Sequence, residues 1–291
     1  MFHGSISILE NDLQISSSSY KKIISDALNE DLAPNGDVTS SCLIPKNHIS
    51  TFQLILNEEA ILAGLNVFKE VFSSIDENIS FETRCNEGEK SKKSTIVASL
   101  SGSTLSLLKG ERTALNFLSY LSGIATLTKK IVDLLKGSGV ILLDTRKTTP
   151  TLRVLEKYAL RIGGATNHRF SLSEMILIKD NHIACVDGIE KAILKAKESY
   201  SGKLKIEVEV ETFEQLEKAL NLKPDIIMFD NWKANDLKEA VKLVPSDILT
   251  EASGQINLDN IVDYSQTGVK CISTSYMIKN AKWVDYSFNA V

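Results

Sequence analysis

Cysteine and histidine are sparse in this sequence, and neither is arranged as a disulfide or metal framework requires. The four cysteines lie far apart without a C-x-x-C pair, which fits reduced thiols in a cytosolic protein better than disulfides or a zinc site. The four histidines are scattered, and His3 and His48 look incidental. We therefore expect no zinc cluster and a cytoplasmic location.

Long apolar runs and an excess of basic charge are also missing. No stretch approaches the ~18 apolar residues of a membrane span, and the first residues, MFHGSISILENDL, give no reason to expect a secretion signal. The net charge of −4 does not indicate a general affinity for nucleic acid. We expect neither a membrane nor a nucleic-acid partner for this chain of 291 residues, which can form one large or two ordinary domains.

Several common catalytic motifs are absent as well. The chain has no Walker P-loop, no G-x-G-x-x-G, no H-E-x-x-H and no Ser-His-Asp order. The enzyme classes that depend on those motifs are therefore not indicated, and a site must be sought in the pattern of strands and charges.

From residue 140 onward, short apolar runs alternate with helical patterns. Each run is bounded by turn signals, which is typical of a buried strand. Strands that alternate with helices predict a parallel sheet. The commonest closed form has eight strands, but only six are found here: 140–144, 175–178, 205–210, 225–229, 247–250 and 269–273.

The chain before residue 111 mixes strands and helices without strict alternation, which favours an α+β domain. Residues 30–45 read as a loop because of their Pro, Asn, Gly and Asp content. The longest helical pattern covers 111–135. We expect strands on either side of Asn57-Glu58-Glu59, a helix over 65–74, and further strands at 79–84 and 95–100.

Charged residues follow the first two strands of the alternating region. Arg146 and Lys147 come after the first, and Lys179 comes after the second. Between them lies a predicted helix with Thr149 as N-cap, and then the segment Asn167-His168-Arg169. Each charge taken alone could be an ordinary solvated loop residue. As a set they favour a site, because α/β proteins build sites at the carboxyl ends of their strands.

Two acidic residues end the next two predicted strands. Residues 206–211, IEVEVE, alternate strictly, so Glu207, Glu209 and Glu211 share one face. That face could be solvated, but in a barrel an inward carboxylate near the strand end needs a partner. Glu209 and Asp230 would then suit Mg²⁺, which takes one or two carboxylates plus substrate phosphates; two ordinary loop carboxylates are the alternative.

Small residues follow the last two strands, in Glu251-Ala-Ser-Gly254 and Ser273-Thr-Ser275. After late strands of a barrel, small residues let backbone N–H groups approach a phosphate. A short Gly/Ser loop is weak evidence on its own.

Three blocks, DTRKTTP, GGATNHR and LIKDNH, stand in this order and spacing. Together they resemble the quinolinate phosphoribosyltransferase family, as do Gly36-Asp37-Val38-Thr39 and the block GERTALNFL with Arg112. The resemblance implies an α/β fold: an incomplete barrel of about six strands plus an α+β N-terminal domain. We expect the N-terminal domain at 1–110, the catalytic barrel at 111–275, and a tail at 276–291 that packs back on the N-terminal domain.

The resemblance also implies a reaction, de novo synthesis of nicotinate mononucleotide for NAD. Phosphoribosyl pyrophosphate would donate its phosphoribosyl group to quinolinate, with release of pyrophosphate and CO₂ and with Mg²⁺ as cofactor. Arg112, a helix-start surface charge by sequence alone, would reach a neighbouring subunit's site in a homodimer or a higher oligomer. The implied catalytic residues are Lys147, Glu209 and Asp230, the last two also as metal ligands, and the implied substrate-binding residues are Arg112, Arg146, His168, Arg169, Lys179, Ser253, Gly254, Ser273 and Ser275.

Two alternatives stay open. One is a paralogue of the same family, such as the molybdenum-associated proteins, acting on another nitrogen heterocycle. The other is a barrel that binds a phosphorylated ligand without turnover. The sequence departs from the family pattern where glycine is usual, at Thr151, Ala165, Ser171, Gln255 and Ser275, and the last two bear on the phosphate geometry because a side chain limits backbone approach.

Overall fold

The computed structural model describes residues 15–200 and 202–291, which include two compact units. The barrel unit consists of Ile131–Lys147 and Ala165–Tyr276. The sheet unit consists of the described residues up to 130, together with Thr148–Gly164 and Met277–Val291. Within the described residues, no helix has both the length and the apolar character needed to span a membrane.

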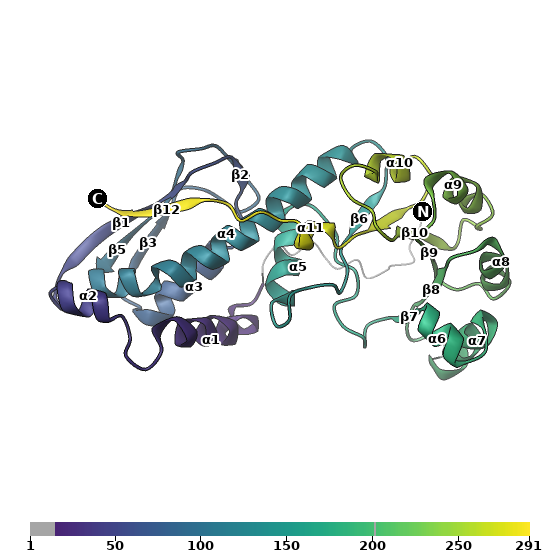
Figure 1. Ribbon diagram of the computed structural model, residues 1–291, viewed down its shortest axis with the longest axis horizontal. Helices are drawn as coiled ribbons and strands as arrows, with labels where there is room; N and C mark the ends of the chain where they lie inside the picture. Colours follow the sequence, from purple (N-terminus) through teal and green to yellow (C-terminus); the bar gives the residue numbers. More distant parts are fainter. Residues whose placement is uncertain (1–14, 201) are drawn as a thin grey trace. The chain divides into compact units, whose positions relative to one another are not determined.

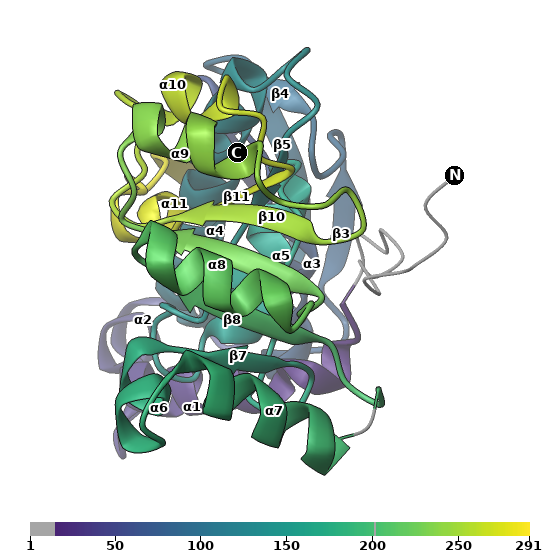
Figure 2. The same cartoon turned by 90° about the vertical axis from the view of Figure 1, so that its right-hand side faces the viewer.

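The barrel unit is built on a six-stranded parallel sheet in the order β6-β11-β10-β9-β8-β7. This confirms the predicted parallel sheet of six strands. Helices alternate with the strands and cover one face of the sheet (Figures 1 and 2). The strands are β6 (Ile141–Leu143), β7 (Ile176–Ile178), β8 (Ile206–Val210), β9 (Ile226–Asp230), β10 (Leu249–Ser253) and β11 (Cys271–Ser273). The helices are α6 (Asp180–Cys185), α7 (Ile189–Tyr200), α8 (Phe213–Asn221), α9 (Ala234–Val241) and α10 (Ile261–Ser265).

The strands of this sheet are buried on both faces, as apolar runs in a parallel sheet require. Val208 and Phe229 are fully buried in the middle of β8 and β9. The edge strands of the sheet are β6 and β7, so the barrel is open between them. Thr212 caps the helix α8, because its side chain accepts a hydrogen bond from the Gln215 amide.

The sheet unit contains a four-stranded antiparallel sheet in the order β12-β1-β5-β3 and a small pair, β2 with β4. The last strand of the chain pairs with β1, far earlier in the sequence (Figure 1). Phe68, Phe72 and Phe288 pack together against this sheet. Its strands are β1 (Ile49–Leu56), β2 (Ala60–Ile61), β3 (Ser80–Thr83), β4 (Lys90–Ser91), β5 (Ile96–Ser103) and β12 (Tyr286–Ala290). Its helices include η1 (Ser17–Ser19), α1 (Lys21–Leu32), α2 (Val38–Leu43), α3 (Leu65–Ile75) and α5 (Arg153–Ile162).

Two helices lie at the borders of the units. The helix α4 (Thr104–Leu134) begins in the sheet unit directly after β5, and the predicted boundary between residues 110 and 111 falls inside it. The short helix α11 (Tyr276–Lys279) follows the last strand of the barrel unit.

Two local predictions are wrong. Residues 30–45 are not simply a loop, because Asp37 caps the short helix α2 by accepting the Ser40 amide. Thr149 is not the N-cap of α5, which starts at Arg153. The backbone amide of Thr149 instead donates to the buried carboxylate of Glu156.

Candidate functional site

A polar cavity of about 400 Å³ lies at the carboxyl ends of the strands of the barrel unit. Every strand of the six-stranded sheet contributes a side chain from its last residues or from the residues that follow it. Among the predicted site residues, those that line the cavity are Arg146, Lys147, His168, Arg169, Lys179, Glu209, Asp230, Ser253 and Ser273. Gly254, Ser275 and Arg112 are not among the lining residues, and Arg112 is an exposed residue of α4 in the sheet unit.

Two arginines face this cavity together. Burial lowers the pKa of Arg169, and the nearby Arg146 guanidinium lowers it further. Both groups remain charged because arginine does not lose its proton in proteins. Lys147 and Lys179 line the same space. Like charges so gathered repel each other, and an anionic ligand with more than one negative group would relieve that repulsion.

A second part of the cavity lining, the acidic wall, consists of Glu209 and Asp230. Glu209 and Asp230 reach the cavity from the neighbouring strands β8 and β9. Burial raises the pKa of Glu209, while the Lys179 ammonium group, which donates to its Oε1 atom, opposes that rise. Asp230 accepts a hydrogen bond of 2.7 Å from the Asn231 side chain at Oδ2. Each carboxylate therefore keeps a second oxygen that can serve a ribose hydroxyl or a metal ion.

His168 lines the cavity, and both its ring nitrogens face protein atoms. Its Nδ1 accepts the Arg169 amide at 2.8 Å. Its Nε2 lies 3.1 Å from Oε2 of Glu207 and 3.6 Å from Oε2 of Glu251, and both glutamates are buried. Burial alone would lower the pKa of His168, but the two carboxylates that face Nε2 outweigh it and raise the pKa. They favour a proton on Nε2, whereas the Arg169 amide, which uses Nδ1 as its acceptor, opposes a second proton on that nitrogen.

The three side chains of His168, Glu207 and Glu251 are close enough to hold a metal ion, with their ligand atoms all within 4.8 Å of one another. A ligating imidazole normally donates its other N–H to an acceptor. Here Nδ1 faces an N–H donor, so Nε2 carries the proton and cannot bind a metal. We interpret the group as a hydrogen-bonded support beneath the cavity. Burial, and after it the facing Glu251, raise the pKa of Glu207, while the hydrogen bond from His168 opposes that rise.

The small residues at the ends of β10 and β11 divide into two groups. Ser253 and Ser273 line the cavity, and the buried Ser273 hydroxyl has no hydrogen-bond partner among the described residues. Gly254 has a φ of 96°, and an added Cβ there would lie 2.7 Å from the backbone nitrogen of Asn231. Glycine is therefore required at 254 by its contact with the neighbouring loop.

Two positions where the related family favours glycine adopt backbone conformations that glycine prefers. Thr151 has a φ of 71° and Gln255 a φ of 53°. Both lie in the left-handed region, which is uncommon for residues with a side chain. The backbone at Gln255 thus keeps a glycine-like path, although its side chain is exposed.

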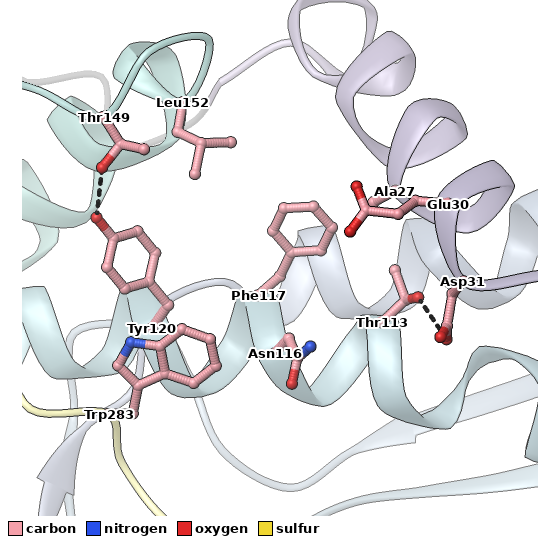
Figure 3. Close-up of a pocket in the computed structure, with 10 residues that line it drawn as sticks. All are labelled: Ala27, Glu30, Asp31, Thr113, Asn116, Phe117, Tyr120, Thr149, Leu152 and Trp283. Atoms are coloured by element: carbon pink, nitrogen blue, oxygen red, sulfur yellow. Dashed lines mark hydrogen bonds between the residues drawn. The ribbon is translucent and has the colours of Figure 1, made fainter.

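A second hollow, of about 470 Å³, belongs to the sheet unit (Figure 3). Phe117, Tyr120 and Trp283 give it aromatic walls, and the charged residues that line it are the acids Glu30 and Asp31. No lysine or arginine lines this hollow. A polyanionic substrate would meet negative charge here and positive charge in the cavity of the barrel unit, so we assign the site to the barrel unit.

Sequence reasoning missed four residues that support the cavity. Glu207 was placed on the correct strand face, but its partners His168 and Glu251 come from other strands or loops. Asp144 and Asn167 were seen only as parts of motifs, and they form a hydrogen bond of 2.7 Å at the edge of the sheet. The available signal was the position of Asp144, since an acidic residue directly after an apolar strand needs a partner.

Family models match nearly the whole described chain. The model for the quinolinate phosphoribosyl transferase C-terminal domain matches residues 124–289, and that for the N-terminal domain matches residues 37–122. Among curated proteins, a probable nicotinate-nucleotide pyrophosphorylase [carboxylating] of Bacillus subtilis is 40% identical over 92% of each chain. A quinolinate phosphoribosyltransferase [decarboxylating] of Nicotiana glauca is 37% identical, over 92% of this chain and 81% of the other.

Solved structures agree with these matches. The nicotinate-nucleotide pyrophosphorylase from Francisella tularensis superposes with a TM-score of 0.91 at 36% identity, covering 97% of this chain and 100% of the other. The enzyme of that name from Ehrlichia chaffeensis gives a TM-score of 0.90 at 33% identity, covering 96% of this chain and 100% of the other. The likeness thus extends over both units of the chain.

Proposed function

The chain belongs to the quinolinate phosphoribosyltransferase family, and we propose that the polar cavity of its barrel unit is where it joins quinolinate to phosphoribosyl pyrophosphate. The products are nicotinate mononucleotide, pyrophosphate and CO₂, which makes the protein a pentosyltransferase of NAD biosynthesis. The observation that carries this assignment is the pair Arg146 and Arg169, which face one cavity with two lysines beside them. Quinolinate carries two carboxylates on a flat ring, and guanidinium groups bind carboxylates through paired N–H donors.

The basic wall holds the pyridine end of the reaction. Arg146, Arg169 and Lys179 bind the two carboxylates, and Lys147 borders the same space. This arrangement directs the ring nitrogen toward the ribose. Such positioning can supply much of the rate enhancement without a covalent nucleophile from the protein.

The acidic wall holds the ribose end. As the ring nitrogen bonds to the ribose carbon C1, the C1–oxygen bond breaks and its electron pair leaves with pyrophosphate. Positive charge develops on the ribose in the transition state, and the carboxylates of Glu209 and Asp230 stabilise it. We assign the phosphate groups to Ser253 and Ser273, and this assignment is supported by the position of both serines in the lining of the same cavity.

Mg²⁺ fits the acidic wall as a cofactor that arrives with phosphoribosyl pyrophosphate. Glu209 and Asp230 offer two carboxylates on neighbouring strands, each with one oxygen not used by the protein contacts described above. Mg²⁺ prefers one or two carboxylates plus substrate phosphates. When bound, the ion would neutralise charge on the leaving pyrophosphate.

Decarboxylation follows the transfer. Once the ring nitrogen carries the ribose it is positively charged, and the adjacent carboxylate leaves as CO₂ while its bonding electrons stay on the ring carbon. That carbon then takes a proton, which completes nicotinate mononucleotide. The guanidinium groups keep the second carboxylate bound during this step, so the ring stays in place.

We also propose a homodimer with shared sites, or a higher oligomer built from it, located in the cytoplasm. The support for sharing is Arg112, an exposed cation of the sheet unit that does not line the cavity. A partner's Arg112 would add a further positive group for the dicarboxylate. The support for the cytoplasm is that all four cysteines are free thiols.

One assay separates this function from its alternatives. Pyrophosphate release is measured with phosphoribosyl pyrophosphate and Mg²⁺, with quinolinate, nicotinate and nicotinamide supplied in parallel. CO₂ release is followed from quinolinate labelled in the carboxylate next to the ring nitrogen. We expect matched release of pyrophosphate and CO₂ with quinolinate. Binding without release would favour the non-catalytic barrel, and release with another heterocycle alone would favour the paralogue.

A further inference from the structure

The opening of the barrel between β6 and β7 is bridged by one segment, Ala165–Met175. At its start, the Thr166 amide donates to the Leu142 carbonyl at 2.8 Å and the Asp144 amide donates to the Thr166 carbonyl at 3.2 Å. These bonds attach the segment to the outer edge of β6. At its other end, Nη1 of Arg169 donates to the Met175 carbonyl at 2.9 Å, directly before β7. The segment therefore connects the two edge strands of the sheet.

The carboxylate of Asp144 holds this segment beside the cavity. It is 1% exposed and directly follows β6. Its Oδ1 accepts the His168 backbone amide at 2.7 Å, and its Oδ2 accepts the Asn167 side-chain amide at 2.7 Å. One buried carboxylate thus fixes both the backbone and a side chain of the bridging segment. Hydrogen bonds to a charged, buried acceptor are among the stronger ones in proteins.

The hydrogen bond between Asp144 and Asn167 lies close in sequence to the two arginines of the cavity. Asp144 precedes Arg146 by two residues, and Asn167 precedes Arg169 by two residues. The two guanidinium groups line the same cavity and repel each other. A carboxylate–amide contact two residues behind each arginine opposes that repulsion by holding the loops together.

We propose that Asp144 and Asn167 act as positioning residues, a latch that fixes the separation of Arg146 and Arg169 for a dicarboxylate substrate. The proposal rests on the proposed function, since it concerns how the same cavity recognises quinolinate. Neither latch residue needs to touch the substrate. Its effect is selective: loosening the latch weakens the pyridine end, while Glu209 and Asp230, on β8 and β9, keep their places.

The test uses the full-length protein and exchanges the two latch groups. Asn167→Asp places two carboxylates face to face, and we expect the KM for quinolinate to rise by about tenfold or more, with the KM for phosphoribosyl pyrophosphate nearly unchanged. Adding Asp144→Asn restores one amide and one carboxylate in reversed order. The side-chain carbonyl that this second substitution introduces can still accept the His168 amide, so the double variant should recover most of the quinolinate KM.

Asn86→Asp is the matched control, because the Asn86 side chain donates to Glu89 at 2.9 Å in an exposed turn of the sheet unit. It should leave both KM values unchanged. The latch is overturned if Asn167→Asp leaves the quinolinate KM unchanged, if the double variant brings no recovery, or if both KM values change together with a lower melting temperature. The unmodified protein is assayed alongside: if it is inactive with quinolinate the proposed function fails and the latch with it, whereas an active parent with unresponsive variants refutes the latch alone.

Discussion

The ammonium group of Lys179 donates a hydrogen bond to Oε1 of Glu209, so the basic and acidic walls of the cavity meet in one ion pair. Lys179 follows β7 and Glu209 lies on β8, its direct neighbour in the sheet. The proposed function assigns them to different ends of the reaction, Lys179 to the pyridine and Glu209 to the ribose. Their contact means that the two ends are coupled, and that a change at one residue also changes the charge at the other.

Lys179→Met should lower kcat/KM for quinolinate by about tenfold or more, and should weaken phosphoribosyl pyrophosphate binding less. The loss has two causes: a cation for the dicarboxylate disappears, and burial is left unopposed in raising the pKa of Glu209. The variant should therefore also need more Mg²⁺. Lys179→Met combined with Glu209→Gln should lose less than the product of the single losses, as measured in a double-mutant cycle. Strictly multiplicative losses would contradict the coupling.

Asp230→Asn tests the placement of the metal and ribose. The substitution keeps size and removes charge, so turnover should fall by about a hundredfold or more because transition-state charge loses a stabilising partner. The measurement is kcat over a range of Mg²⁺ concentrations. Asp236→Asn, in the first turn of α9, makes the same chemical change outside the cavity and should be silent. A folded Asp230→Asn protein with near-normal turnover would show that the assignment is wrong.

Arg112 should act across subunits if the protein is the proposed homodimer. Arg112→Ala and Lys179→Ala are each expected to be inactive. After subunit exchange, one site of each mixed dimer combines an intact Lys179 with an intact Arg112. Random mixing of equal amounts should then restore about a quarter of the parent activity. As a control, mixing Arg112→Ala with the double variant Arg112→Ala/Lys179→Ala creates no intact site. No recovery after verified exchange would exclude the shared role.

We expect a substitution at Glu156 to change the stability of the protein and not its turnover. It is fully buried, its oxygens accept the Thr149 amide at 3.2 and 3.0 Å, and Oε1 also accepts the Tyr120 hydroxyl. Glu156→Gln replaces an acceptor by a donor and leaves one of these groups unsatisfied. We expect the free energy of unfolding to fall by about 1–3 kcal/mol, measured by urea denaturation at pH 7. Glu214→Gln, which removes an exposed pair with Lys218, should leave the free energy of unfolding nearly unchanged.

The stability that the contact between Tyr120 and Glu156 contributes should depend on pH. Burial, followed by the hydrogen bond to Glu156, raises the pKa of Tyr120 from 10.0 to about 12. A pKa raised in the folded state means that the stabilisation is complete below pH 10 and is lost as the pH rises toward 12. The stability difference between the parent and Tyr120→Phe should therefore shrink over that range. A difference that stays constant across it would argue against the assignment.

The fold was largely predictable because each strand of the sheet in the barrel unit corresponds to a short apolar run in the sequence. Each of the six predicted strands of the barrel unit is present, since a parallel strand buried on both faces leaves a clear apolar signal. The local errors occurred where side chains decide the backbone. Residues 30–45 look like a loop by composition, yet Asp37 caps a helix within them. Thr149 looks like an N-cap, yet its backbone amide donates a hydrogen bond to the Glu156 carboxylate. Thr151 has a positive φ, which is not a helical conformation, so α5 starts only at Arg153.

The candidate site was predictable as a set of charges that line one cavity, but not as a set of contacts. Strand ends gave Arg146, Lys179, Glu209 and Asp230, because carboxyl ends of parallel strands meet at one edge of the sheet. The same reasoning gave no partner for any of them. The contact of His168 with Glu207 and Glu251 joins segments far apart in the chain, and no local pattern reports which buried groups face each other. The prediction that His168 binds substrate stays untested, although both its nitrogens face protein atoms.

We expect the protein to select quinolinate over nicotinate because several cationic side chains line one cavity. Nicotinate lacks the carboxylate next to the ring nitrogen, so Arg146 and Arg169 would face one substrate carboxylate instead of two, while Lys179 already pairs with Glu209. A charge left without a partner in a closed pocket costs several kcal/mol. At about 1.4 kcal/mol per tenfold change, we expect kcat/KM for quinolinate to exceed that for nicotinate by about a hundredfold or more.

Nicotinamide, which has no charge, should be poorer still, and the three substrates are compared by pyrophosphate release under the same conditions. Arg169→Met provides an internal check because it removes one cation from the cavity and leaves the acidic wall intact. Quinolinate should then lose more than nicotinate, so the ratio of their kcat/KM values should narrow. Comparable values for the two substrates in the unmodified protein would refute a site built for two carboxylates and would favour a paralogue that acts on another nitrogen heterocycle.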